Sequence, residues 1–155
     1  MKLSIFIDVV ILLLLFFFLK RKKLYLHENI FLLMILEFLV TSYCAIIYIN
    51  LDDWNIAKGT ELFIIFRVYE VVMYPVIWII YFNLLLWKGS RTYKWLLTVG
   101  TIGIQVGIEQ WLRKWSIITY RDWSLLQSLM IQILVLFLTA ISLYWYRYME
   151  GRETT

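Results

Sequence analysis

Five apolar runs, separated by short polar breaks, constrain the fold of this chain more than any other feature of its sequence. Each run is close to, or longer than, the ~17 residues that an α-helix needs to cross a bilayer. Because lipid offers no hydrogen bonds to a free backbone, each crossing segment must be helical. The runs cover residues 3–19, 30–50, 62–87, 95–112 and 124–146. We therefore predict an all-α, polytopic membrane protein: a bundle of five transmembrane helices that forms one domain over residues 1–155.

The composition agrees with a membrane location. Of the 155 residues, 63% are hydrophobic and only 17% are charged, which leaves too little polar surface for a soluble domain. The net charge of +4 comes from short basic clusters between the apolar runs, a pattern typical of membrane topology signals rather than of nucleic-acid binding. The first run is followed by "KRKK" and not by a small-residue cleavage site, so we interpret it as a retained anchor.

The lysines and arginines outside the runs predict the orientation. One side of the bundle collects nine of them and the other side five, and the richer side should be cytoplasmic. The richer group is Lys20, Arg21, Lys22, Lys23, Lys88, Arg91, Lys94, Arg147 and Arg152. The poorer group is Lys2, Lys58, Arg113, Lys114 and Arg121. This places the N-terminus outside and the C-terminus in the cytoplasm, in a multi-pass protein of the cell membrane. All tryptophans except Trp78 fall at or near the ends of runs, as interfacial rings do.

Several polar side chains lie inside the runs. In this topology six of them fall in the outer half of the bundle, namely Asp8, Arg67, Glu70, Gln105, Glu109 and Gln127. A charged residue near the bilayer centre costs roughly 2.5–3.5 kcal/mol on insertion scales. We therefore expect these side chains to face the bundle interior and to pair with one another.

Arg67 and Glu70 support two interpretations. At i and i+3 they are neighbours on one helix face and can neutralise each other, as a structural ion pair. Alternatively, Arg67 receives an anionic or carboxylate-bearing group in a polar pocket open to the outside, with Tyr69, Tyr74 and Glu109 as its walls. Asp8 is most simply a partner for Arg67 or a residue at the water boundary.

Two further features stand apart from this cluster. Glu37 lies nearer the cytoplasmic end, and we expect a protonated carboxyl that bonds to Asn83 or to a serine. Gly100, Gly103 and Gly107 form one stripe on the fourth helix, which lets another helix approach closely. Gln105 and Glu109 lie on the opposite side, so this helix belongs in the middle of the bundle or at an oligomer interface.

The sequence favours a non-enzymatic protein. The only histidine, His27, stands beside a basic cluster, which argues against histidine-based metal sites and against a catalytic triad. The only cysteine, Cys44, lies within an apolar run, and we interpret it as a small buried apolar residue. With no phosphate loop and no CxxC pair, we expect no cofactor, no metal and no catalytic residues.

The stretch "GIEQWLRKWSIITYRDWSLLQS" resembles part of a group of small multi-spanning membrane proteins of unknown function from Gram-positive spore-forming bacteria. The resemblance rests on Glu109, Tyr120, Trp123 and Ser128, and "YPVIWIIYFN" resembles an earlier part of the same pattern. It implies a five-helix fold in a bacterial cell membrane and carries no activity.

Three functions remain open at this point. The first is an accessory or interaction subunit of a bacterial membrane assembly, working as a homo-oligomer or with a membrane protein partner. The second is a small-solute binding or transport component, with a polar pocket in the outer half of the bundle. The third is a membrane enzyme acting on a lipid or isoprenoid, but no spacing of residues supports it over the other two.

Overall fold

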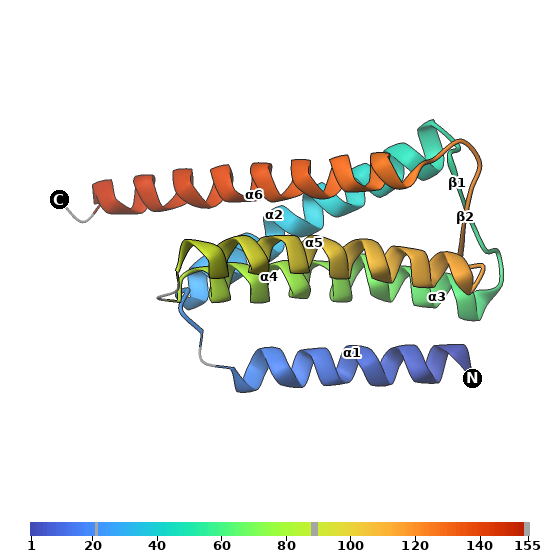
Figure 1. The fold of residues 1–155 in the computed structure, drawn as a ribbon, viewed down its shortest axis with the longest axis horizontal. Helices are drawn as coiled ribbons and strands as arrows, with labels where there is room; N and C mark the ends of the chain where they lie inside the picture. The colour runs from blue at the N-terminus through green and yellow to red at the C-terminus, as the bar shows by residue number, and fades with distance from the viewer. Residues whose placement is uncertain (21, 88–89, 154–155) are drawn as a thin grey trace.

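A computed structural model of the chain describes residues 1–20, 22–87 and 90–153. Arg21 and Lys88, two of the residues in the charge balance, lie outside the described residues. The described chain is almost entirely helical, as predicted (Figure 1). Its elements are, in chain order, α1 (Lys2–Leu19), α2 (Leu26–Ala45), the π-helical η1 (Ile46–Asn50), β1 (Trp54–Ile56), α3 (Thr60–Val68), the π-helical η2 (Tyr69–Met73), α4 (Tyr74–Leu85), α5 (Arg91–Lys114), β2 (Ile118–Tyr120) and α6 (Leu125–Glu153).

Four helical segments are long and apolar enough to cross a membrane. They are Lys2–Leu19, Leu26–Asn50, Thr60–Leu85 and Leu125–Gly151. These segments account for four of the five predicted runs, to within a few residues at their ends. The fourth run lies in α5, which is long enough but less apolar, since Gln105, Glu109 and several threonines interrupt it. By length and composition four segments are therefore compatible with a membrane, and a bundle of five crossings stays a prediction.

The long helices lie lengthwise beside one another, and α4 occupies the middle (Figure 1). α4 contacts α1, α2 and α5, while α6 packs against α2 and α5, and α1 also packs against α3. The N-terminus lies at the same end of the bundle as the two short strands, and the C-terminus lies at the opposite end. Successive helices thus alternate in direction along the bundle.

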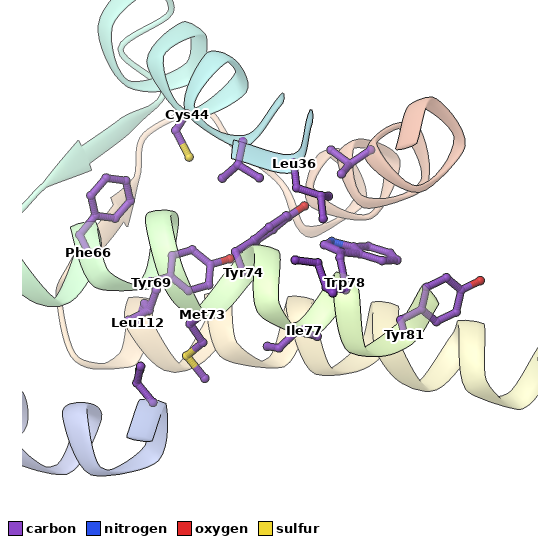
Figure 2. Close-up of a cluster of buried hydrophobic side chains, with 14 of the residues drawn as sticks. Leu36, Cys44, Phe66, Tyr69, Met73, Tyr74, Ile77, Trp78, Tyr81 and Leu112 are labelled. Atoms are coloured by element: carbon purple, nitrogen blue, oxygen red, sulfur yellow. The ribbon is translucent and has the colours of Figure 1, made fainter. Parts of the chain in front are cut away.

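The core is centred on α4, which is apolar on all sides and buried along most of its length. Tyr74 and Trp78 are completely buried, as is Tyr69 just before them. Figure 2 shows these rings with residues of α2, such as Leu36, and of α5, such as Leu112. Trp54, which lies outside the apolar runs, is also buried, at 1% exposure.

Pro75 explains why the third apolar run is not one regular α-helix. Proline has no N–H, so the carbonyl of Val71 loses the hydrogen bond that a regular α-helix would give it. The turn before Pro75 widens into the π-helical η2, where the N–H of Tyr74 donates to the carbonyl of Tyr69. The irregularity at this proline is thus a π segment shortly before it.

A two-stranded ribbon, which was not predicted from the sequence, lies at one end of the bundle. β1 and β2 pair antiparallel, with Trp54 opposite Tyr120 and Ile56 opposite Ile118. Trp54, Ile56 and Ile118 are buried, so each strand alternates between inward and outward side chains. The ribbon ties the connection between α2 and α3 to the connection between α5 and α6.

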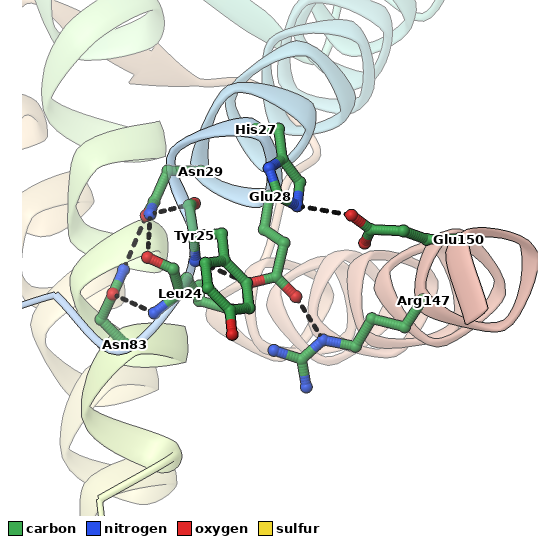
Figure 3. A network of polar contacts seen from close by, with 8 residues as sticks. All are labelled: Leu24, Tyr25, His27, Glu28, Asn29, Asn83, Arg147 and Glu150. Atoms are coloured by element: carbon green, nitrogen blue, oxygen red, sulfur yellow. Dashed lines mark hydrogen bonds and ion pairs between the residues drawn. The ribbon is translucent and has the colours of Figure 1, made fainter. Parts of the chain in front are cut away.

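Asn83, near the end of α4, holds the connection between α1 and α2 (Figure 3). Its Oδ1 accepts hydrogen bonds from the backbone N–H groups of Lys23 (3.0 Å) and Leu24 (3.1 Å). Its Nδ2 donates to Asn29 Oδ1 (2.8 Å) and to the carbonyl of Ile79 (2.9 Å). The buried side chain of Asn83 therefore uses its full set of donors and acceptors.

Two polar side-chain contacts join α2 to α6 beside this network (Figure 3). The buried carboxylate of Glu28 accepts from Arg147 Nε at 2.5 Å, and its other oxygen caps α2 by accepting from the Tyr25 N–H at 2.7 Å. His27 Nε2 lies 2.8 Å from Glu150 Oε1. Glu28 and Asn29 lie in the first turn of α2, so the start of this helix is fixed to both α4 and α6.

We expect Asn83→Ala to destabilise the protein strongly. The substitution leaves two backbone N–H groups and the Asn29 oxygen without their partner, at roughly 1–3 kcal/mol for each buried group left unpaired. The measurement is the free energy of unfolding in mild detergent, titrated with a denaturing detergent and followed by tryptophan fluorescence. The control is Asn50→Ala, because Asn50 is exposed at the end of η1. Equal stability of the two variants would contradict this role of Asn83.

Candidate functional site

Arg67 and Glu70 form an ion pair within the third apolar run. Arg67 Nη1 donates to Glu70 Oε2 at 2.7 Å, across the junction of α3 and η2. The carboxylate side chain is only 2% exposed, whereas the guanidinium side chain is 50% exposed and also lies over the Phe63 ring. The pair is therefore asymmetric: Glu70 is enclosed by the bundle, and Arg67 keeps donor groups available on its outer side.

The pair lines a pocket of about 200 Å³ between α2 and α3. Its lining residues are Thr41, Cys44, Ala45, Tyr48, Ile49, Phe66, Arg67 and Glu70. Tyr48 and Ile49 also line a larger hollow of about 520 Å³, where Asp52, Asn55, Lys58 and Arg121 gather near the ribbon. The two cavities thus meet at shared residues. The predicted walls of the pocket were wrong, because Tyr69, Tyr74 and Glu109 do not line it.

Glu109 belongs to a different set of contacts, between α5, β2 and α6. Its Oε1 accepts hydrogen bonds from the hydroxyls of Tyr120 and of Ser128, the latter at 2.5 Å. Ser128 Oγ in turn accepts from Trp123 Nε1 at 2.8 Å, and Gln110 Nε2 donates to the Tyr120 hydroxyl at 3.3 Å. A buried carboxyl that accepts two hydroxyl donors is well satisfied without a basic partner.

Aromatic rings enclose this carboxyl at the ribbon. Tyr120 is stacked on Trp54, with ring centroids 6.1 Å apart, and Trp123 meets Trp54 edge-on at 5.9 Å. The Arg113 guanidinium lies over the Tyr120 ring, 4.7 Å from its centre. Burial and the nearby Glu109 carboxyl raise the pKa of the Tyr120 phenol above its usual value. Tyr120 therefore stays protonated at neutral pH and remains a donor to Glu109.

Gln105 ties α5 to α4. Its Nε2 donates to the backbone carbonyl of Tyr74 at 3.1 Å, and its side chain is completely buried. The Tyr74 hydroxyl donates to Gln132 Oε1, on α6, at 2.7 Å. Tyr74 therefore connects three helices. Gln132 was not among the predicted polar residues, although an amide in the middle of an apolar run is the same signal that identified Gln105.

Three of the six residues in the predicted cluster lie apart from the ion pair and from Glu109. Asp8 is exposed on α1, opposite the side that Phe6 and Val10 bury, and it does not pair with Arg67. Gln127 is a cap of α6: its Oε1 accepts from the Ser124 N–H at 2.6 Å and from the Ser124 hydroxyl at 2.8 Å. The capping sequence S-x-x-Q at the start of the fifth run would have revealed this.

Gln105 is the third of these residues, and neither Gln105 nor Glu109 contacts Arg67. The predicted single cluster is therefore divided into separate sites. Arg67 and Glu70 form an ion pair in α3 and η2, and Glu109 accepts from two hydroxyl groups at the ribbon. Gln105 donates to the Tyr74 carbonyl. The division has a simple cause, because Arg67 and Glu70 satisfy each other within one helix and so need no group from α5.

Glu37 is not bonded as predicted. Asn83 donates and accepts elsewhere, and Glu37, which is half-buried on α2, makes no hydrogen bond or ion pair within the described part of the chain. The glycine stripe on α5 is open: a methyl group added at Gly100, Gly103 or Gly107 would meet nothing within 4 Å. These glycines pack against no helix among residues 1–20, 22–87 and 90–153, while Gln105 and Glu109 occupy the buried opposite side.

Residues 1–20, 22–87 and 90–153 contain no group of three or more histidine, cysteine, aspartate or glutamate side chains that could hold a metal ion. Cys44 is buried, and His27 pairs with Glu150 on another part of the bundle. The arrangement can bind and position charged or polar groups through Arg67, Glu70 and the hydroxyls beside them. No protein-family model, curated protein or solved structure matches this chain.

We expect Tyr120→Phe to lower the stability of the protein by about 1–3 kcal/mol, because Glu109 loses one of its two buried hydroxyl donors. Ser128→Ala should act similarly and should also shift tryptophan emission, since Trp123 loses its partner. The measurement is thermal unfolding in detergent, followed by tryptophan fluorescence. Tyr144→Phe is the matched control, because Tyr144 is exposed on α6. If Tyr120→Phe unfolds at the same temperature as Tyr144→Phe, the carboxyl does not depend on this phenol.

Proposed function

We propose that the chain crosses a bacterial cell membrane five times and serves as a non-enzymatic interaction subunit of a membrane assembly. Its N-terminus would lie outside and its C-terminus in the cytoplasm. The observation that supports this function best is the open glycine stripe of α5, Gly100, Gly103 and Gly107, which no helix covers within the described ranges. Small residues of this kind are typical of surfaces where transmembrane helices approach each other closely.

The division of the side chains of α5 favours a crossing by this helix despite its lower hydropathy. Its polar residues Thr101, Gln105 and Glu109 are buried against α4, β2 and α6, whereas its outer side presents Leu96, Val99 and the glycines. A hydropathy average counts the buried polar groups, although lipid would never contact them. An α5 that stands beside α4 and α6 is therefore compatible with the bilayer.

The orientation rests on the basic residues at the two ends of the bundle. By the bounds of the helices, Lys20, Lys22, Lys23, Arg91, Lys94 and Arg147 belong to the segments at one end of the bundle, and Lys2, Lys58, Arg113, Lys114 and Arg121 belong to the segments at the ribbon end. By their positions in the sequence, Arg21, Lys88 and Arg152 add to the first group. The excess favours the cytoplasm for the end where α6 finishes.

Asp8 offers a second contact for a partner. It lies on the side of α1 that faces away from the bundle, and within the described part of the chain it has no hydrogen bond or ion pair. A carboxylate in an apolar helix is costly in lipid unless a partner group neutralises it. A basic or hydrogen-bonding residue on a neighbouring transmembrane helix would remove this cost.

We expect Gly103→Leu to abolish or greatly weaken the association of the protein with its membrane partner. The leucine side chain would hold an approaching helix away, while the stability of the isolated chain would stay equal or rise slightly, because leucine favours helix more than glycine by roughly 0.5–1 kcal/mol. The measurement is chemical cross-linking in native membranes, followed by purification in mild detergent and mass spectrometry of whatever remains bound.

The matched control is Gly59→Leu, which makes the same change at an exposed glycine before α3, also with nothing within 4 Å. Thermal unfolding of both variants in detergent separates a loss of association from a loss of folding. An unchanged set of cross-linked proteins in a well-folded Gly103→Leu variant would defeat the proposal, and so would equal loss in Gly59→Leu.

A second candidate function is the binding of a small carboxylate-bearing solute in the Arg67 pocket. The specific support is that the half-exposed guanidinium meets a cavity of about 200 Å³, which shares residues with the larger hollow near the ribbon. Thr41 and Tyr48 add hydroxyl groups to the wall. An arginine with donors available toward a pocket suits a carboxylate.

For this candidate we expect small carboxylates, tested as acetate, succinate and glutamate, to raise the unfolding temperature of the parent protein but not of the double variant Arg67→Gln with Glu70→Gln. The double change removes the ion pair without leaving Glu70 buried and unpaired, so the variant should still fold. Arg121→Gln, a change in the outer hollow, is the control. An equal response of the parent and the double variant to every carboxylate would eliminate the pocket as a solute site.

A further inference from the structure

A groove of about 500 Å³ opens between α4, α5 and α6, away from the Arg67 pocket and away from the glycine stripe. α5 contributes Arg91, Lys94 and Trp95 from its first turns, and α6 contributes Ile133 and Phe137. The groove has a structural cause. Near the ribbon, the bond between Glu109 and Ser128 joins α5 to α6, and the groove opens between the same two helices toward their other ends.

The mouth of the groove carries positive charge without an anionic partner. Arg91 and Lys94 are exposed, and neither forms an ion pair with a carboxylate among the described residues. Arg67, Arg121 and Arg147 each pair with a carboxylate, whereas Arg113 lies over the Tyr120 ring. At i and i+3, Arg91 and Lys94 lie on one side of the helix, at its N-terminal end, where the backbone also favours an anion.

The body of the groove is apolar. Ile133 and Phe137 are more than half exposed, although they belong to a helix that otherwise packs against α2 and α5. The hydroxyls of Tyr81 and Thr98 in the wall bond to each other at 2.9 Å, so no polar group there needs an outside partner. Trp95, 64% exposed beside Lys94, has the amphipathic ring that favours the headgroup level of a bilayer.

We propose that this groove binds one anionic phospholipid, with its phosphate between Arg91 and Lys94 and an acyl chain along Ile133 and Phe137. The inference relies on the proposed membrane location but not on an interaction subunit. A basic mouth followed by an apolar groove between helices matches the two chemical parts of such a lipid. A second transmembrane helix would match the apolar body only, and a free phosphate would match the mouth only.

The experiment compares the retention of two lipids with identical acyl chains, phosphatidylglycerol and phosphatidylcholine, by the purified full chain. The protein is prepared in mild detergent with an equal mixture of the two lipids, and native mass spectrometry counts the lipids that remain bound. We expect the parent to prefer phosphatidylglycerol by about tenfold or more, and higher salt to reduce this preference.

The double variant Arg91→Gln with Lys94→Gln should lose most of that preference. The matched control is Arg113→Gln with Lys114→Gln, which removes the same charge from the other end of α5 and should keep the preference. Ala140→Trp fills the groove from α6 and should reduce the retention of phosphatidylglycerol while both basic residues stay. Thermal unfolding of each variant in detergent checks that it is folded.

Four outcomes would overturn the proposal. The first is an unchanged preference in the folded Arg91 and Lys94 variant. The second is an equal loss in the Arg113 and Lys114 control, which would mean diffuse attraction to the whole protein. The third is displacement of phosphatidylglycerol by millimolar inorganic phosphate, which would mean a phosphate site rather than a lipid site. The fourth is full retention in Ala140→Trp, which would leave the apolar groove without a role.

Discussion

Hydrogen bonds between buried polar groups hold the helices of the protein together, although a few buried atoms, such as Gln105 Oε1 and Thr139 Oγ1, have no partner among the described residues. Tyr74 is the clearest case, because its carbonyl accepts from Gln105 on α5 and its hydroxyl donates to Gln132 on α6. Asn83 does the same at the other end of α4, where it holds the connection between α1 and α2. In an apolar medium an unpaired polar group is costly, so such bonds specify which helices meet and in what register. α4 occupies the centre because it carries both of these residues.

The cost of an unpaired polar group also explains why charge is placed differently at the two ends. Near the ribbon, Glu109 is satisfied by hydroxyl groups and enclosed by aromatic rings, with Arg113 over the Tyr120 ring rather than on the carboxyl itself. At the opposite end, Glu28 is buried and takes Arg147 as a true ionic partner. Between these ends, Arg67 and Glu70 neutralise each other within one helix. Because this pair is complete in itself, Arg67 can face a cavity without destabilising the bundle.

The five helical segments could be predicted from the sequence because apolar runs of spanning length leave the backbone one conformation. The pairing of Arg67 with Glu70 followed from their i, i+3 spacing. The partners of other polar residues depend on tertiary contacts that spacing does not report. Gln127 looked like a membrane residue and is a cap, whereas Gln132, five positions further on, is buried. The partner of Asn83 is a connection between helices and not Glu37, and the ribbon consists of strands too short to stand out from a loop.

The exterior of the bundle divides α5 between two kinds of neighbour. Its glycines face outward on one side, where a closely packed helix fits, and its first turns open on another side into the groove beside α6. The two surfaces do not overlap. Gly100, Gly103 and Gly107 lie on the outer side of α5, whereas Lys94 and Thr98 lie on the inner side, which faces α4 and α6. A bound lipid would therefore fill the space between α5 and α6 and support α5 from within while a partner helix packed on the glycines. The lower hydropathy of α5 would then follow from its position. Its inner side would contact protein and a lipid headgroup, and only a narrow strip of its surface would contact acyl chains.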